Sequence, residues 1–254
     1  MSTATGAGVE LVAAWRLLSL GFTAPDEETL AEIEALGEAI LERAEGGDDP
    51  TAPALVELLA ALGRGDSVEE LAGAYQALFG GEVAVPPYEG SYEGDPFRHT
   101  RQMADVAGFY RAFGAEAHGP AAERVDHAGC ELEFLAFLGA KRLALAAEGR
   151  DDEAQTCREI EGLFLRDHLG RWLPAFCRDI AARTSTPFYA ALARAGEQVV
   201  AGELARRGIE PEPLGRRKRW TVEADCLECG LANAGSPATT PVRARHDAVP
   251  PSGG

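Results

Sequence analysis

The residues of this chain best suited to chemistry stand just before a long apolar segment, in the stretch Glu123-Arg-Val-Asp-His-Ala-Gly-Cys-Glu131. Asp126 and His127 lie at the entrance of the helix that this segment predicts, and Glu131 lies one turn further on. Carboxylates beside an imidazole could form a hydrolytic or a metal-binding site. An aspartate here is also a common N-cap, because its carboxylate accepts the free amide hydrogens of the first turn. The residues alone leave both interpretations open.

Two further stretches could supply polar groups. Upstream lies a proline-stiffened loop that carries Tyr88, Glu89 and Tyr92. Its tyrosines offer flat rings with hydrogen-bonding ends, which suit peptide binding and also suit packing of the loop onto the core. Downstream, His168 precedes Trp172 by about one helical turn, and we expect a structural role for that histidine.

No catalytic motif accompanies these groups. The sequence contains no Gly-x-Ser-x-Gly elbow, no His-Glu-x-x-His pair and no phosphate-binding loop. We therefore predict that the chain is not an enzyme. The alternative that stays open is a metal-dependent helical enzyme that uses His127, His168 and neighbouring carboxylates.

A candidate metal site lies near the C-terminus, at Cys226 and Cys229. Their CxxC spacing is compatible with zinc, an iron–sulfur cluster or a dithiol, but a closed zinc site needs four ligands. His246 is a possible third ligand, and through this pair the chain could instead be a regulatory protein that senses metal or redox state. Otherwise we expect no cofactor. The other cysteines fall within apolar helical patterns and are predicted to be small core residues: Cys130, Cys157 and Cys177.

The charge of the chain restricts its partners. Lys and Arg number 24 against 41 Asp and Glu, which gives a net charge of -17. Such a surface repels phosphate backbones, so we expect no nucleic acid partner. It would attract basic partners, including a peptide with paired arginines, although the charge could also serve solubility alone.

Targeting signals are lacking in the sequence. No apolar run approaches the roughly 20 residues that a membrane-spanning helix needs, and the N-terminus has neither the basic region nor the apolar core of a signal peptide. An odd number of cysteines, five, fits a reducing compartment. We predict a cytoplasmic protein without membrane insertion.

The elements that must position these groups are helices, because apolar residues recur at helical spacing from about residue 9 to residue 207. Ser67-Val-Glu-Glu70 is a capping box that starts one of them. Loops are predicted at 82–98 and 115–124, and the helix expected from about 152 to 182 is interrupted near its glycine, Gly170. The aromatic and leucine residues of these helices are predicted to be mostly core: Phe134, Leu135, Phe137, Leu138, Phe164, Trp172, Leu173 and Phe176.

The domain organisation follows from where this periodicity ends. We predict an all-α chain with one domain, a helical bundle over residues 1–210. Residues 211–254 are rich in Pro, Gly and Ala and include a basic cluster, Arg216-Arg-Lys-Arg219, and the CxxC pair. This composition predicts a flexible tail.

The three polar stretches together resemble the TorD/DmsD/NarJ family, the all-helical cytoplasmic chaperones for molybdenum-containing oxidoreductases. The resemblance covers about residues 55–205. It implies a TorD-like bundle that binds the N-terminal signal region, usually a twin-arginine one, of the catalytic subunit of such an enzyme. The chaperone would hold that region during maturation, before export or assembly. The residues that the resemblance assigns to signal-peptide binding are Tyr88, Glu89, Tyr92, Glu123, Asp126, His127 and Glu131.

Two positions depart from the family pattern. Arg124 stands where the family commonly has a proline, which could loosen the loop-to-helix junction. Gly90 precedes Ser91, so the match to the family's Tyr-Glu-Ser motif is partial. We expect Asp126 and His127 to lie near solvent, where they would affect peptide binding more than folding.

Overall fold

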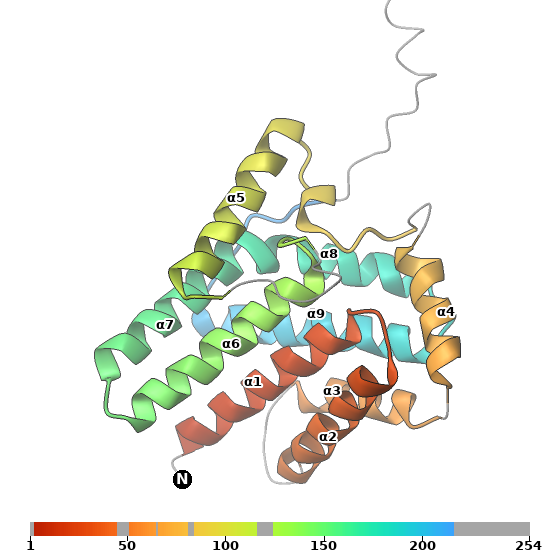
Figure 1. The fold of residues 1–254 in the computed structure, drawn as a ribbon, viewed down its shortest axis with the longest axis horizontal. Helices are drawn as coiled ribbons and strands as arrows, with labels where there is room; N and C mark the ends of the chain where they lie inside the picture. The colour runs from red at the N-terminus through yellow and green to blue at the C-terminus, as the bar shows by residue number, and fades with distance from the viewer. Residues whose placement is uncertain (1–2, 45–50, 65, 81–83, 116–123, 216–254) are drawn as a thin grey trace, which may run out of the picture. The chain divides into compact units, whose positions relative to one another are not determined.

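The chain folds into helices, as the sequence predicts. The computed structural model describes residues 3–44, 51–64, 66–80, 84–115 and 124–215. Within these ranges the only strand-like pairing is a single bridge between Tyr88 and His127. Figure 1 labels the helices, whose bounds in chain order are α1 (Thr3–Gly21), α2 (Glu27–Ala44), α3 (Ala52–Leu62), α4 (Val68–Phe79), η1 (Glu89–Ser91), α5 (Pro96–Ala112), α6 (Ala128–Ala147), α7 (Asp151–Phe164), η2 (Leu165–Leu169), α8 (Gly170–Ala181) and α9 (Pro187–Arg207).

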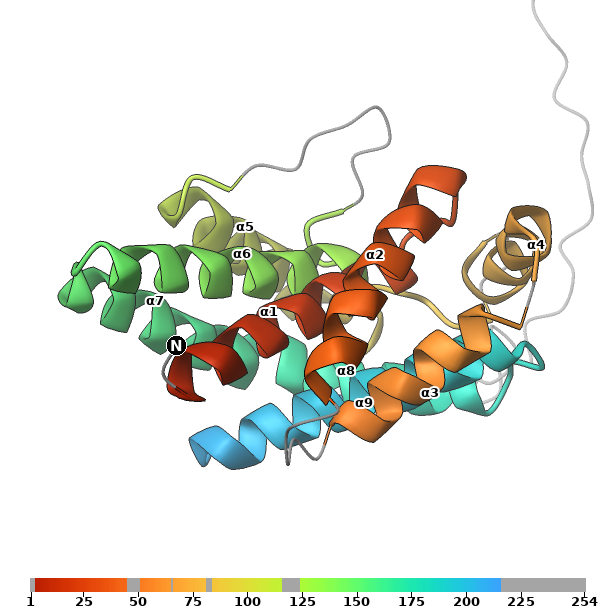
Figure 2. The same ribbon diagram turned by 90° about the horizontal axis from the view of Figure 1, so that it is seen from below.

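Helix α6, which carries the Asp-His stretch at its start, lies between α1 and α7 (Figures 1 and 2). Its approach to α1 is close because glycine stands at the contact. A Cβ atom added at Gly139 would lie 2.6 Å from Cγ2 of Val12 on α1. Near the start of α6, Ser19 Oγ of α1 donates a hydrogen bond to the carbonyl oxygen of Gly129 at 2.9 Å. The entrance of α6 is therefore fixed against a second helix.

Helices α8 and α9 form the other major pair, and α3 packs on α9 (Figure 2). The helices bury a continuous core in which aromatic rings contact one another. The predicted core residues are buried with one exception, since the side chain of Phe137 is 38% exposed. The prediction for the cysteines holds for Cys157 and Cys177, whereas Cys130 is only partly buried.

A wide turn interrupts the long helix that carries His168. α7, η2 and α8 follow one another without a loop, and η2 is a π-helical turn. Pro174 has no N–H to donate to the carbonyl of Gly170, and its ring crowds that carbonyl, so the helix widens nearby. A Cβ at Gly170 would lie 2.4 Å from the backbone oxygen of Leu165. The interruption predicted near Gly170 is thus a bulge within the helix and not a break.

The capping box predicted at Ser67 forms in the structure, because it depends only on residues that are close in the sequence. Ser67 Oγ accepts the amide hydrogen of Glu70 at 3.2 Å, and Glu70 Oε2 accepts that of Ser67 at 2.8 Å. Both halves of the capping box at the start of α4 are therefore present.

The described chain continues beyond α9. Gly208 ends that helix in the left-handed conformation, with φ of 64°. Residues 211–215, which the sequence assigns to a flexible tail, lie against α8, where the Leu214 amide donates to the Arg171 carbonyl at 2.7 Å. The rest of the predicted tail lies outside the described residues, so its flexibility stays a prediction. None of the described helices is long and apolar enough to span a membrane.

Candidate functional site

The proline-rich loop and the start of α6 are joined through their backbones. The Glu89 amide donates to the Asp126 carbonyl at 2.9 Å, and the Ala128 amide donates to the Pro87 carbonyl at 2.9 Å. Around these bonds Tyr88 and His127 form an antiparallel bridge, with their rings 5.3 Å apart. Two stretches that are about 40 residues apart in the sequence thus form one structure, which we call the junction (residues 87–92 and 124–131).

The N-cap of α6 is the histidine of the Asp-His pair. His127 Nδ1 accepts the amide hydrogen of Gly129 at 3.1 Å. The carboxylate of Asp126 turns the other way, and its Oδ2 accepts the amide hydrogen of Gly90 at 3.1 Å. The interpretation of Asp126 as the cap of this helix is therefore wrong, because a partner distant in sequence takes its carboxylate.

Arg124 holds the junction together where the family commonly has a proline. Its Nη2 donates to Asp126 Oδ2 at 2.8 Å and lies 2.7 Å from His99 Nε2. Its guanidinium also stacks over the Tyr88 ring, 4.4 Å from the ring centroid. The expectation that this departure loosens the junction is therefore wrong.

The glycine at position 90 leaves room for a neighbouring side chain. A Cβ at Gly90 would lie 1.9 Å from Cδ2 of His99, which reaches the loop from α5. A serine directly after Glu89 would require that imidazole ring to move. At this second departure from the family pattern, the imidazole ring of His99 occupies the space beside Gly90.

The carboxyl group of Glu131 is fully buried inside the molecule. Trp172 Nε1 on α8 donates to its Oε2 at 3.0 Å. Burial raises the pKa of Glu131 well above its ordinary 4.5, and the nearby carboxylate of Glu89 raises it further. A protonated Glu131 is the form that this environment favours.

His168 connects the junction to the outside of the protein. Its Nδ1 lies 3.1 Å from Glu89 Oε2, and both side chains are buried. Its Nε2 lies 3.4 Å from Oδ2 of Asp105, whose side chain is 66% exposed. The wide turn of η2 carries this histidine. The structural role predicted for His168 therefore extends to a contact with Glu89 that the sequence did not indicate.

The residues assigned to signal-peptide binding are mostly not at the surface. Glu123 lies outside the described residues, and Tyr88 is half-buried. The remaining five are at most 2% exposed: Glu89, Tyr92, Asp126, His127 and Glu131. The expectation that Asp126 and His127 lie near solvent is wrong, because the loop and Arg124 cover them. The surface of the junction is formed instead by Tyr88, Arg124 and His99.

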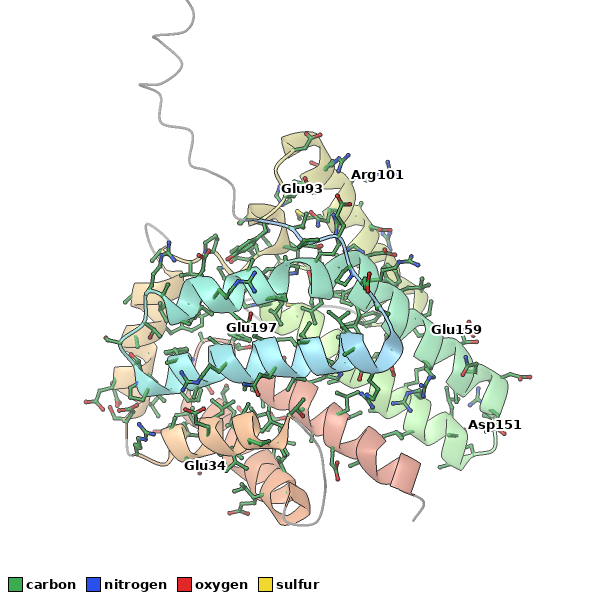
Figure 3. All side chains as sticks on the ribbon, turned by 180° about the vertical axis from the view of Figure 1, so that it is seen from behind. Glu34, Glu93, Arg101, Asp151, Glu159 and Glu197 are labelled. Atoms are coloured by element: carbon green, nitrogen blue, oxygen red, sulfur yellow. The ribbon has the colours of Figure 1, made fainter. Side chains whose placement is uncertain are left out.

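A pocket of about 580 Å³ lies on the other side of His168. Its walls come from α5, from η2 with the first turn of α8, and from residues 210–212 after α9. Figure 3 labels Glu93 and Arg101 at this end of the molecule, and both line the pocket. No pattern in the sequence indicates this pocket, because its walls come from segments that share no motif.

The metal predictions remain largely untested. Within the described ranges, no three or more His, Cys, Asp or Glu side chains are grouped so that they could hold a metal ion. The candidate ligands Cys226, Cys229 and His246 lie outside those ranges. The predicted tail site and the sensing role based on it therefore stay predictions.

Comparisons with known proteins agree on one family. The profile of the nitrate reductase delta subunit family matches residues 44–178, more than half of the chain. The chain is 35% identical over 150 residues to a selenate reductase assembly chaperone from Thauera selenatis, covering 58% of this chain and 75% of that protein. It is 32% identical over 155 residues to a chlorate reductase assembly chaperone from Ideonella dechloratans, covering 60% and 76%. Against the chaperone TorD of Aeromonas salmonicida the identity is 32% over 152 residues, covering 58% and 66%.

Among solved structures, a redox enzyme maturation protein from Archaeoglobus fulgidus matches with a TM-score of 0.49 and 25% identity, covering 75% of this chain and 93% of that one. The relatives are named as chaperones and not as catalysts, which confirms that the chain is not an enzyme. The metal-dependent enzyme based on His127 and His168 is therefore wrong. By its sequence matches, the chain belongs to the nitrate reductase delta subunit family, which is the TorD/DmsD/NarJ family of molybdoenzyme maturation chaperones.

Proposed function

We propose that this chain is a cytoplasmic chaperone that binds the N-terminal signal region of the catalytic subunit of a molybdenum-containing oxidoreductase. It would hold that region during maturation, before export or assembly. The proposal is supported by the family and by relatives named as assembly chaperones of selenate and chlorate reductases.

The single observation that carries the proposal is the construction of the junction. Here the aromatic ring of Tyr88 and the guanidinium of Arg124 meet at the surface over a layer of buried polar groups. An amphipathic aromatic side chain beside a charged group suits a peptide with both apolar and polar residues. The buried layer of Glu89, Asp126 and His127 would then position the loop and not contact the peptide.

Charge favours the same partner. The first 80 residues contain 15 Asp and Glu but only 3 Lys and Arg. Several of these carboxylates on α2 are exposed, among them Glu34 and Glu38. An acidic surface increases the rate at which a basic peptide associates, and this effect weakens with salt.

The test is calorimetry at low salt with the N-terminal peptide of a co-encoded molybdoenzyme catalytic subunit. We expect a dissociation constant of about 1 μM or tighter. Asp126→Ala should weaken binding although Asp126 is buried, because the Gly90 amide of the loop loses the carboxylate that accepts its hydrogen bond. Thermal unfolding is measured in parallel, so that a loss of folding is not mistaken for a loss of binding. If wild-type protein gives no heat and does not co-purify with the full-length client, the proposed function is wrong.

A further inference from the structure

The segment after α9 lies across α8 as an extended strap, which we define as residues 209–215. Besides the bond from the Leu214 amide to the Arg171 carbonyl, the Arg171 Nε donates to the Glu212 carbonyl at 3.0 Å. Ile209 and Leu214 are partly buried against the core. Figure 3 shows this segment leaving α9 and running back across α8 towards α5. The strap is thus a wall of the pocket described above and holds Glu210 and Glu212 there.

Most of the arginines that line the pocket already have partners. Arg166 forms two hydrogen bonds with Asp167, at 2.8 and 2.6 Å. Arg171 donates to the carbonyls of Glu212 and Asp167. Arg98 lies 3.9 Å from Asp95. Arg101 has neither a hydrogen bond nor an ion pair with any residue that the structure describes, and Arg171 has hydrogen bonds but no ion pair.

The acidic and amide side chains that line the pocket have fewer hydrogen-bond and ion-pair partners than its arginines. The side chains of Glu210 and Glu212 have no hydrogen bond or ion pair within the described part of the chain. Among the residues that the structure describes, Asp105 has one charged partner, His168, at 3.4 Å. Gln102 is 9% exposed, and neither its amide oxygen nor its amide nitrogen has a hydrogen-bond partner among the described residues. Buried amides normally have partners, so the unpartnered amide of Gln102 beside the pocket is free to pair with a molecule that enters it.

We propose that this pocket binds a guanidinium group of a partner peptide, with Asp105, Glu210 and Glu212 as its acceptors. A guanidinium has five N–H donors in a planar fork, which suits oxygens that come from separate elements. The volume of about 580 Å³ lies within the range of ligand pockets and exceeds the space that one side chain needs. Gln102 then accepts from the same group or pairs with the backbone of the peptide.

This inference rests on the proposed function, because it says where a basic residue of the signal region would lie. It also extends that function, since none of these acceptors belongs to the junction. His168 separates the two sites, with Glu89 on one side and Asp105 on the other. A peptide that reached from the junction to the pocket would pass along α5.

The experiment is a titration of ¹⁵N-labelled full-length protein with the dipeptide acetyl-Arg-Arg-amide at low salt. We expect saturable changes of the amide resonances around residues 98–105, 166–171 and 210–214. The double variant Glu210→Gln/Glu212→Gln should weaken this binding about 10-fold or more, since it removes two charge-assisted partners. Acetyl-Gln-Gln-amide and acetyl-Glu-Glu-amide should cause no such changes.

The matched control is Glu34→Gln/Glu38→Gln, which removes the same charge from α2, far from the pocket in Figure 3. This control variant should weaken binding less than about two-fold, because its charges act on the dipeptide only through the long-range electrostatic field of the protein. Equal weakening by both double variants, changes centred outside the pocket, or binding of acetyl-Glu-Glu-amide in the pocket would overturn the inference. The client peptide is tested separately: if it binds while the dipeptide does not, this inference alone fails. If the dipeptide binds and the client peptide does not, the proposed function alone fails.

Discussion

Trp172 is the donor on which the buried polar network depends, so its replacement tests the network directly. Its indole N–H donates to Glu131 Oε2 at 3.0 Å, and the carboxyl group of Glu89 lies close to the same side chain. Trp172→Phe removes that donor from a fully buried carboxyl group, which costs about 1–3 kcal/mol. The smaller ring also leaves a gap beside Phe176, which adds about 1 kcal/mol. We expect the free energy of unfolding to fall by about 2–4 kcal/mol.

The assay is urea unfolding followed by circular dichroism, with Trp15→Phe as the matched control. Trp15 is also in the core, 3% exposed, but no carboxyl group accepts from its indole within the described residues. Its replacement should therefore cost only the cavity term, about 1 kcal/mol. A second variant, Glu131→Leu/Trp172→Phe, replaces both partners by apolar groups and should recover much of the loss. If Trp172→Phe costs no more than Trp15→Phe, or the double variant is no more stable than Trp172→Phe, the hydrogen bond does not stabilise the fold as described.

Three other substitutions have defined outcomes. Because burial raises the pKa of Glu131, the folded chain keeps a proton that the unfolded chain releases near its ordinary pKa, and stability should fall as pH rises from about 4.5 through the raised pKa. Glu131→Gln cannot ionise and should flatten this slope in urea unfolding at several pH values; an unchanged slope would contradict the assignment. Gly139→Ala should destabilise the fold by about 1–2 kcal/mol, since its Cβ meets the stiff side chain of Val12 at 2.6 Å. Gly108→Ala in α5, with nothing within 4 Å, should instead stabilise it by about 0.5–1 kcal/mol in the same thermal or urea assay, and equal effects of both changes would refute the packing argument.

The sequence by itself determined the fold class and the family of this protein. Helical periodicity of apolar residues and the capping box at Ser67 depend on residues within a few positions of one another, so they can be recognised without coordinates. The family resemblance rested on three short motifs, and the sequence matches confirm it. The polar residues in those motifs were therefore identified, although their surroundings were not.

Only the tertiary structure decided what those polar residues do. From its position Asp126 could cap its own helix, but Gly90, 36 positions earlier in the chain, donates to its carboxylate, and His127 is the cap. The burial of Glu131 depends on Trp172 from another helix, 41 positions away. Burial and hydrogen-bond partners across such separations depend on how helices pack, and a local pattern of residue types carries no information about that packing. The pocket could not be predicted from the sequence for the same reason. Its acceptors Asp105, Glu210 and Glu212 come together because the strap runs back across α8.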